Sequence, residues 1–286
     1  MTSASLRQCV LMVSVLHGID VIPRDDGVSL PPNPSVASSE ALLVPWSTIE
    51  SVLRDFSDVT DTVARKHLAH WFTTARGLGD LSLQEFLTYV TVIGMPHNAP
   101  AHPGSAWTHT EVLGGALHLG LGLRLLGHLS DETSALTPEL MAVLGHDPAR
   151  AWEAGWTYLN AMGQLAADRH GRDPVAVLRP MGDCDVVSLL GSPHFRACLA
   201  QFHNVGMRAV AVPMRTRGWV DPNHLDSAFV QGAAAATDRQ QRGFTTAMLV
   251  TADGVWEAKP SENLVDFALR DAKQASNWID QSRFRR

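Results

Sequence analysis

Histidines gather in one short segment of this chain, MPHNAPAHPGSAWTHTE at residues 95–111. His97, His102 and His109 lie within it, and His118 follows shortly after. An imidazole exchanges a proton near neutral pH and binds a metal ion through its free nitrogen. Because prolines stiffen the segment, we expect residues 95–107 to form a distal loop that presents imidazoles to a pocket as acid, base or ligand. A plain polar loop is the alternative, since loops tolerate histidine freely.

His203 is a second candidate, and it lies in the apolar run QFHNVGMRAV. If one helix runs through this segment, Leu199, Gly206, Met207 and Val210 share the face of His203. The ring then meets an apolar wall with one side chain missing, which leaves room for a flat metal cofactor against the imidazole. A core histidine satisfied by a hydrogen bond explains the same pattern.

Two further pairs have helical spacing. His67 and His70 are one turn apart and fit a metal from one helical face, but an HExxH motif and further ligands at conventional spacing are missing. His194 and Cys198 also lie one turn apart, which fits a thiolate–imidazole pair or a haem attachment site. Each pair alone is weak evidence for a site.

The elements that must position these residues are predicted to be mostly helices. Ser47, Ser82 and Thr108 each stand three residues before a glutamate, which is the spacing of a capping box. Prolines at 138, 148 and 222 follow capping residues, as is typical of a first helical turn. The strand-like segments are few, at 208–214 and 246–258, and the second has an Asp-Gly hairpin turn.

These signals predict a mainly α fold in a single domain over 1–286. We expect an irregular arm at 23–46, a minor β-hairpin near the C-terminus, and an amphipathic helix from Ser261. The helix predicted to begin at Thr108 carries Glu111 and His118 on one face, two turns apart. That separation is too large for a tight metal pair.

Composition excludes several classes of protein. The formal charge of −6 argues against binding nucleic acid by neutralising phosphates. Three cysteines without paired spacing indicate neither a disulfide framework nor a zinc knuckle, and they fit a reducing cytoplasm. The apolar run near the N-terminus is shorter than a membrane span requires, so no membrane is expected as a partner.

Two segments together resemble the tryptophan 2,3-dioxygenase superfamily of histidine-ligated haem enzymes. They are LSLQEFLTYVTVIG at 81–94 and FHNVGMRAVAVPMRTRG at 202–218. The resemblance implies a helical bundle that binds haem b, with His203 as the axial ligand and metal contact. It also implies that the loop 212–221, with Arg215 and Gly218, covers the cofactor. Gly206 and Met207 would then lie at the haem, and Met207 in place of a cysteine implies non-covalent attachment.

One departure narrows the implied activity. The dioxygenases bind the substrate carboxylate with an arginine at the position where this chain has Thr108. In this respect the chain is more similar to the peroxide-using tyrosine hydroxylases of that superfamily. The resemblance thus implies conversion of L-tyrosine to L-DOPA with hydrogen peroxide, in antibiotic or other secondary-metabolite biosynthesis, by a homodimer. His97 is the expected distal base, with His102 and His109 as substitutes. The expected substrate contacts are Trp107, Thr108, Glu111 and Arg217.

Other functions remain open on the same residues. A haem dioxygenase or monooxygenase acting on a tryptophan-like or methylated tyrosine substrate fits the resemblance as well. A non-catalytic helical ligand-binding protein would show the same caps and apolar faces. A non-haem metal enzyme that uses His67, His70 and loop carboxylates is a third alternative.

Overall fold

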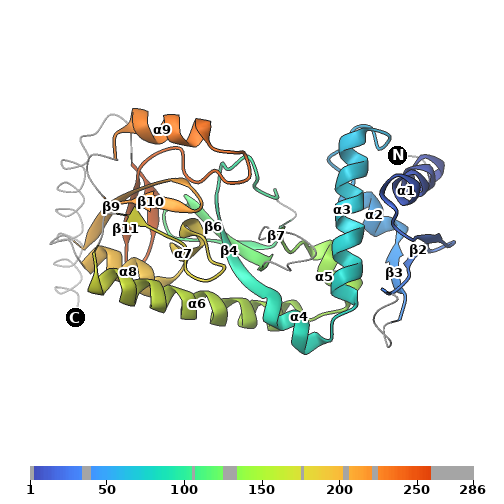
Figure 1. The fold of residues 1–286 in the computed structure, drawn as a ribbon, viewed down its shortest axis with the longest axis horizontal. Helices are drawn as coiled ribbons and strands as arrows, with labels where there is room; N and C mark the ends of the chain where they lie inside the picture. Colours follow the sequence, from blue (N-terminus) through green and yellow to red (C-terminus); the bar gives the residue numbers. More distant parts are fainter. Residues whose placement is uncertain are drawn as a thin grey trace, which may run out of the picture. The chain divides into compact units, whose positions relative to one another are not determined.

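The fold is mixed α/β. The computed structural model of the 286-residue chain describes residues 3–33, 40–104, 107–124, 134–174, 177–201, 206–220 and 225–258. Of the described residues, 44% are helix and 23% are strand, and the strands form three antiparallel sheets (Figure 1). The prediction of a mainly α, helical-bundle fold was therefore wrong. The chain divides into two compact units, 1–90 with 123–154, and 91–122 with 155–286.

The first unit combines helices with a small sheet. Its helices are α1 (Ser3–His17), α2 (Trp46–Val52), α3 (Thr62–Gly79), α4 (Leu83–Tyr89) and α5 (Pro138–Leu144). Its strands β1 (Ile22–Pro23), β2 (Gly27–Leu30) and β3 (Leu42–Pro45) pair in the order β1-β2-β3, and β7 (Ser134–Ala135) also lies in this unit. The segment expected to be an irregular arm, 23–46, thus contains strands. Residues 34–39 lie outside the described ranges.

Capping signals in this unit were right at α4 and α5 and wrong at α2. Ser82 and Glu85 form a complete capping box at α4. Thr137 caps α5, and Pro138 occupies its first turn. The box expected at Ser47 does not form, because α2 begins at Trp46, and Pro45 at its N-cap provides no side-chain hydrogen bond.

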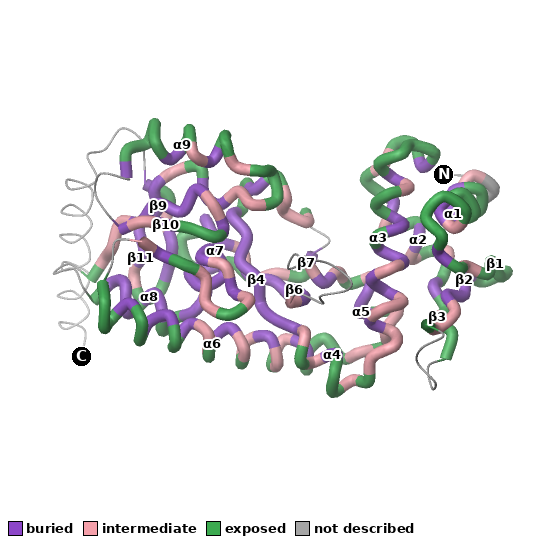
Figure 2. Tube along the Cα trace, viewed as in Figure 1, coloured by how far each residue is buried: buried purple, intermediate pink, exposed green. Residues whose placement is uncertain are grey.

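The second unit contains two sheets. One has the order β4-β6-β5, from β4 (Val90–Pro96), β5 (His109–Glu111) and β6 (Leu117–Leu123). Figure 2 shows β4 buried along its whole length. The other has the order β12-β11-β9-β10-β8, from β8 (Val177–Leu178), β9 (Met207–Met214), β10 (Arg217–Trp219), β11 (Met248–Thr251) and β12 (Val255–Glu257).

Helices cover the five-stranded sheet on its two faces. α9 (Ser227–Ala236) packs against β9 on one face, while α8 (Pro193–Gln201) packs against β11 and β9 on the other (Figure 1). The long helix α6 (Pro148–Arg172), of which residues 155–172 belong to this unit, and the short α7 (Val186–Leu189) are the other helices among its described residues. The predicted hairpin at 246–258 is confirmed as β11 and β12. The helix predicted from Ser261 lies outside the described residues.

The helix predicted to begin at Thr108 is a pair of strands instead. Residues 109–123 form the hairpin β5–β6, because Gly114 and Gly115 adopt left-handed φ angles of 103° and 71° that turn the chain. The strand predicted at 208–214 is confirmed as β9, which begins at Met207, and α8 ends at Gln201. Gly206 and Met207 therefore do not share a helix face with Leu199, and His203 lies outside the described residues.

No described helix has the length and apolar character needed to cross a membrane.

A buried ion pair ties several elements of the second unit together. Arg215 is 7% exposed, and its Nη2 lies 2.5 Å from Asp185 Oδ2, while its Nη1 lies 2.9 Å from Met95 Sδ. The other oxygen of Asp185 accepts a hydrogen bond from the Ser188 amide and so caps α7. Ser188 Oγ in turn accepts from the amide of Gly94 in β4. This network joins β4, α7 and the turn between β9 and β10.

We expect Asp185→Ala to lower the free energy of unfolding by about 3–5 kcal/mol, because it leaves the Arg215 charge buried and unpaired. Asp226→Ala is the matched control, since Asp226 caps α9 without an ion pair and its loss costs about 1 kcal/mol. Urea unfolding of both variants measures the difference. Equal losses would show that the ion pair contributes nothing beyond the cap.

We also expect stability to fall as the pH falls below 6.5, the ordinary pKa of histidine. Burial lowers the pKa of His170, and Arg208 and Arg169 lower it further against an opposing effect of Asp173. The unfolded chain therefore takes up a proton before the folded chain does. His170→Gln should flatten the dependence of the unfolding free energy on pH between about 7.5 and 5.5. An unchanged slope in urea unfolding would contradict this contribution.

Candidate metal centre

Three imidazoles converge in the second unit. His102, His109 and His118 each offer a ring nitrogen, and these nitrogens lie within 4.8 Å of one another. His102 Nε2 is 3.0 Å from His118 Nδ1. The rings of His109 and His118 stack, with centroids 4.5 Å apart and planes inclined by 16°. All three residues are partly buried, so the cluster opens to solvent on one side.

The hairpin β5–β6 explains why two of these rings meet. Its register places Glu111 opposite His118, and His109 opposite Gly120. Because side chains alternate between the faces of a strand, these four residues share one face of the hairpin. His109 and His118 are diagonal neighbours there, and this distance lets aromatic side chains touch.

Trp107 fixes the start of the hairpin. Its side chain is 1% exposed, and its Nε1 donates a hydrogen bond to the Leu121 carbonyl at 2.9 Å. The indole occupies the space that Gly120 leaves, where a Cβ would lie 2.2 Å from the indole ring. The Trp107 carbonyl oxygen lies 2.7 Å from His109 Nδ1. A carbonyl only accepts, so His109 Nδ1 carries the proton and Nε2 presents its lone pair.

The third imidazole comes from the loop after β4. The His97 amide donates to the Ala116 carbonyl at 3.1 Å, and Arg239 donates to the Pro100 carbonyl from Nε and Nη2. The His102 amide donates to the Ala99 carbonyl at 2.9 Å. These backbone contacts hold the loop so that His102 packs edge-on against His109 and His118.

Two carboxylates border the cluster. Glu111 Oε1 lies 3.8 Å from His118 Nε2, and Glu257 Oε1 lies 3.8 Å from His97 Nδ1. The rings of His97 and His118 are 6.4 Å apart between centroids. His97 thus stands beside the cluster without joining it.

The electrostatic environment lowers the pKa of two of the three rings. Burial lowers the pKa of His102, and the neighbouring imidazoles of His118, His109 and His97 lower it further. Burial also lowers the pKa of His118, with His109 acting in the same direction and Glu111 against it. Near pH 7 the rings of His102 and His118 are therefore uncharged and hold a lone pair each.

Three neutral imidazole nitrogens fit a divalent transition-metal ion. Zinc binds histidine nitrogen at about 2.0–2.1 Å in tetrahedral geometry, which places two such nitrogens about 3.3 Å apart. The 3.0 Å between His102 Nε2 and His118 Nδ1 is within a few tenths of an ångström of that value. Imidazole also suits copper, iron and nickel, whereas magnesium and calcium prefer oxygen ligands.

The structure brings together only some of the residues that the sequence singled out. His102, His109, Trp107 and Glu111 meet at the cluster, with His97 beside it. Arg215 is paired with Asp185, and Arg217 is exposed on β10. Thr108 is exposed just before β5, and Gly206 and Met207 lead into β9. His203 lies outside the described residues.

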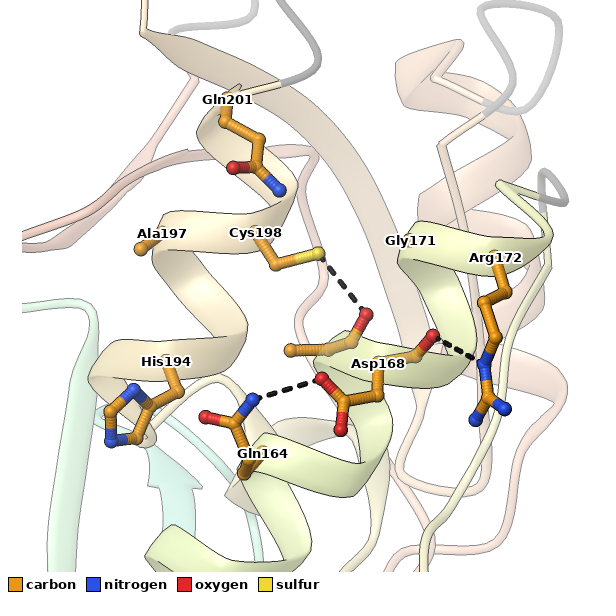
Figure 3. Close-up of a pocket in the computed structure, with 9 residues that line it drawn as sticks. Gln164, Asp168, Gly171, Arg172, His194, Ala197, Cys198 and Gln201 are labelled. Atoms are coloured by element: carbon orange, nitrogen blue, oxygen red, sulfur yellow. Dashed lines mark hydrogen bonds between the residues drawn. The ribbon is translucent and has the colours of Figure 1, made fainter.

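The other predicted pairs form no metal group among the described residues. The His67 ring packs against Phe56. Cys198 lines a cavity of about 630 Å³ between α6 and α8, and in Figure 3 it and His194 point in different directions from α8. The Cys198 thiol donates to the Ala167 carbonyl at 3.3 Å, and burial raises its pKa. A protonated thiol is not a nucleophile, so the thiolate–imidazole pair has no support.

Comparison with known proteins adds no relative. No protein-family model, no curated protein and no solved structure matches this chain. The function must therefore be argued from the cluster itself.

Sequence reasoning named His118 but assigned it to a helix, and so it did not join the predicted site. A period-two signal was present in LHLGLGL, where leucine occupies every second position from Leu117 to Leu123. Reading that alternation as a strand after the Gly114-Gly115 turn would have paired His118 with Glu111 and placed it near His109.

We expect Gly120→Ala to disrupt the cluster, because the added Cβ meets the Trp107 ring. Overpacking of this kind costs about 1–3 kcal/mol of unfolding free energy, and displacement of Trp107 moves the carbonyl that orients His109. Zinc affinity should fall about tenfold or more. Gly232→Ala in α9 is the control, since its Cβ meets nothing within 4 Å and the change should be neutral or stabilising. Zinc titration and urea unfolding test both variants, and an unaltered zinc affinity in Gly120→Ala would contradict the role of Trp107.

Proposed function

We propose that this chain is a metal-dependent enzyme in which His102, His109 and His118 bind one divalent transition-metal ion of the zinc class. The observation that carries the proposal is the convergence of three ring nitrogens within 4.8 Å. A chance meeting of three imidazoles on a partly exposed surface gains little stability, because their like charges repel as soon as they are protonated.

Contacts beyond the three nitrogens support the same assignment. The Trp107 carbonyl fixes the His109 tautomer so that Nε2 is free. Glu111 lies beside His118 Nε2, which favours a proton there and leaves Nδ1 for the metal. A ligating histidine usually donates its other N–H to a carbonyl or carboxylate, as His109 does to the Trp107 carbonyl, whereas Glu111 lies 3.8 Å from His118 Nε2, near it but beyond hydrogen-bond distance.

The donor set indicates the chemistry. Three protein ligands leave a coordination position for water, which is the pattern of catalytic rather than structural zinc sites. Three neutral ligands also leave the charge of the ion uncompensated, so a bound water would lose a proton near neutral pH and act as a nucleophile. His97, half-exposed beside Glu257, is placed to take up that proton. We therefore propose hydrolysis of an ester or amide-like bond as the reaction class.

Haem-dependent hydroxylation of tyrosine stays a prediction. It depends on a resemblance to a family of helical bundles, and this chain has a mixed α/β fold. Its axial residue, His203, lies outside the described residues, and Met207, which was expected on the same helical face, belongs to strand β9. Haem b and hydrogen peroxide therefore have no observation in their favour beyond the resemblance itself.

Metal content of the purified chain tests the proposal. After removal of metal by a chelator, we expect calorimetry to show one bound zinc ion per chain. His102→Ala, His109→Ala and His118→Ala should each weaken zinc binding by about 100-fold or more. His70→Ala is the matched control, because His70 is exposed on α3 and belongs to no metal group, so its affinity should match the wild type.

Activity and colour decide between the alternatives. The zinc-loaded chain should hydrolyse an activated ester such as 4-nitrophenyl acetate, and His109→Ala should lose this activity. An absence of zinc binding, together with a Soret band on addition of hemin that His203→Ala abolishes, would overturn the proposal in favour of the haem enzyme.

A further inference from the structure

The three rings differ in how far they are prepared for a metal ion. His109 already has the tautomer that ligation requires, because its Nδ1–H donates to the Trp107 carbonyl, and His118 directs its Nδ1 at His102 Nε2, 3.0 Å away. His102 lacks the required tautomer, because its Nδ1 accepts a hydrogen bond from the Gly104 amide at 3.0 Å. A neutral imidazole has one N–H, so the Nε2 of His102 must carry the proton in this structure.

A second hydrogen bond agrees with that tautomer. His102 Nε2 lies 3.0 Å from His118 Nδ1, and the proton on Nε2 is the donor for this contact. The nitrogen of His102 that faces the other two rings is thus occupied by a proton. A metal ion at the cluster must displace it.

Ligation therefore changes the contacts of His102 on its opposite side. When Nε2 binds the ion, its proton passes to solvent, and a neutral ring then carries a proton taken from solvent on Nδ1. Nδ1–H is a donor and faces the Gly104 amide, which is also a donor. Two donors cannot share this hydrogen bond, so the turn at 102–104 must move or the ring must rotate away from it.

We propose that metal occupancy of the cluster controls the turn at residues 102–104, because ligation of His102 removes the acceptor of the Gly104 amide. The inference rests on the metal site proposed above. Contacts on both sides confine the change to this turn. Toward the N-terminus, Arg239 holds the Pro100 carbonyl and Ala116 holds the His97 amide. On the other side, Trp107 is fixed by its indole hydrogen bond.

The turn ends at a hydrogen bond with the Trp107 backbone. The Trp107 amide donates to the Gly104 carbonyl at 3.3 Å. A displaced Gly104 therefore loosens this contact at the edge of the cluster while the indole stays anchored at Leu121. The metal-free state is the one with the closed turn, and the metal-bound state is the one with the open turn.

Nuclear magnetic resonance of the full chain with ¹⁵N-labelled histidine tests the inference. Correlations between ring nitrogens and ring carbon-bound protons report the tautomer of each histidine, and His102→Gln assigns the His102 signals. We expect the Nε2–H tautomer without metal and the Nδ1–H tautomer with zinc. Exchange of the Gly104 amide with deuterium should become about tenfold faster with zinc, since it loses one hydrogen bond.

Faster exchange of the Gly104 amide with zinc distinguishes the inference from simple stabilisation of the fold by the metal, which would slow exchange throughout the site. Magnesium should change neither signal, because it prefers oxygen ligands. In His109→Gln, zinc should leave His102 in the Nε2–H form. If zinc binds the wild type but the Gly104 amide exchanges more slowly or His102 keeps its tautomer, the inference fails and the metal site stands. If calorimetry shows no zinc binding, both fail.

Discussion

The packing of Trp107 into the space beside Gly120 is the constraint on which the cluster depends. The indole is buried, is hydrogen-bonded to Leu121, and leaves no room for a side chain at residue 120. Its backbone carbonyl then lies against His109 and determines which nitrogen of that ring is free. The packing of the buried Trp107 indole against Gly120 therefore fixes the orientation of the partly exposed His109 ring.

Hydrogen bonds around the rings determine which nitrogen of each imidazole is free to bind a metal ion. Metal ligation needs a lone pair on each inward nitrogen and a partner for each outward N–H. The Trp107 carbonyl satisfies this requirement for His109, Glu111 lies 3.8 Å from the outward nitrogen of His118, and the Gly104 amide opposes the requirement for His102. The site is thus partly organised in advance, and the remaining reorganisation is confined to a loop, where backbone movement costs least.

Local sequence signals predicted the structure correctly where the hydrogen bonds of an element join residues only a few positions apart. The Ser82 capping box and the hairpin of β11 and β12 need only residues a few positions apart, and both form as expected. The same signal failed at Thr108, because burial of Leu117, Leu119 and Leu121 in a sheet outweighs a weak helix cap. The strand predicted at 208–214 also forms, as β9, and it pairs with β11.

The sequence by itself determined that histidines with a capacity for metal or proton chemistry lie close together along the chain, and His102 and His109 were identified from it. Only the tertiary structure decided that His118 joins them, that Arg215 forms an ion pair with Asp185, and that two of the three rings lie on a β-hairpin. The physical reason is that strand register and burial depend on contacts between distant segments, which no spacing within a single segment specifies.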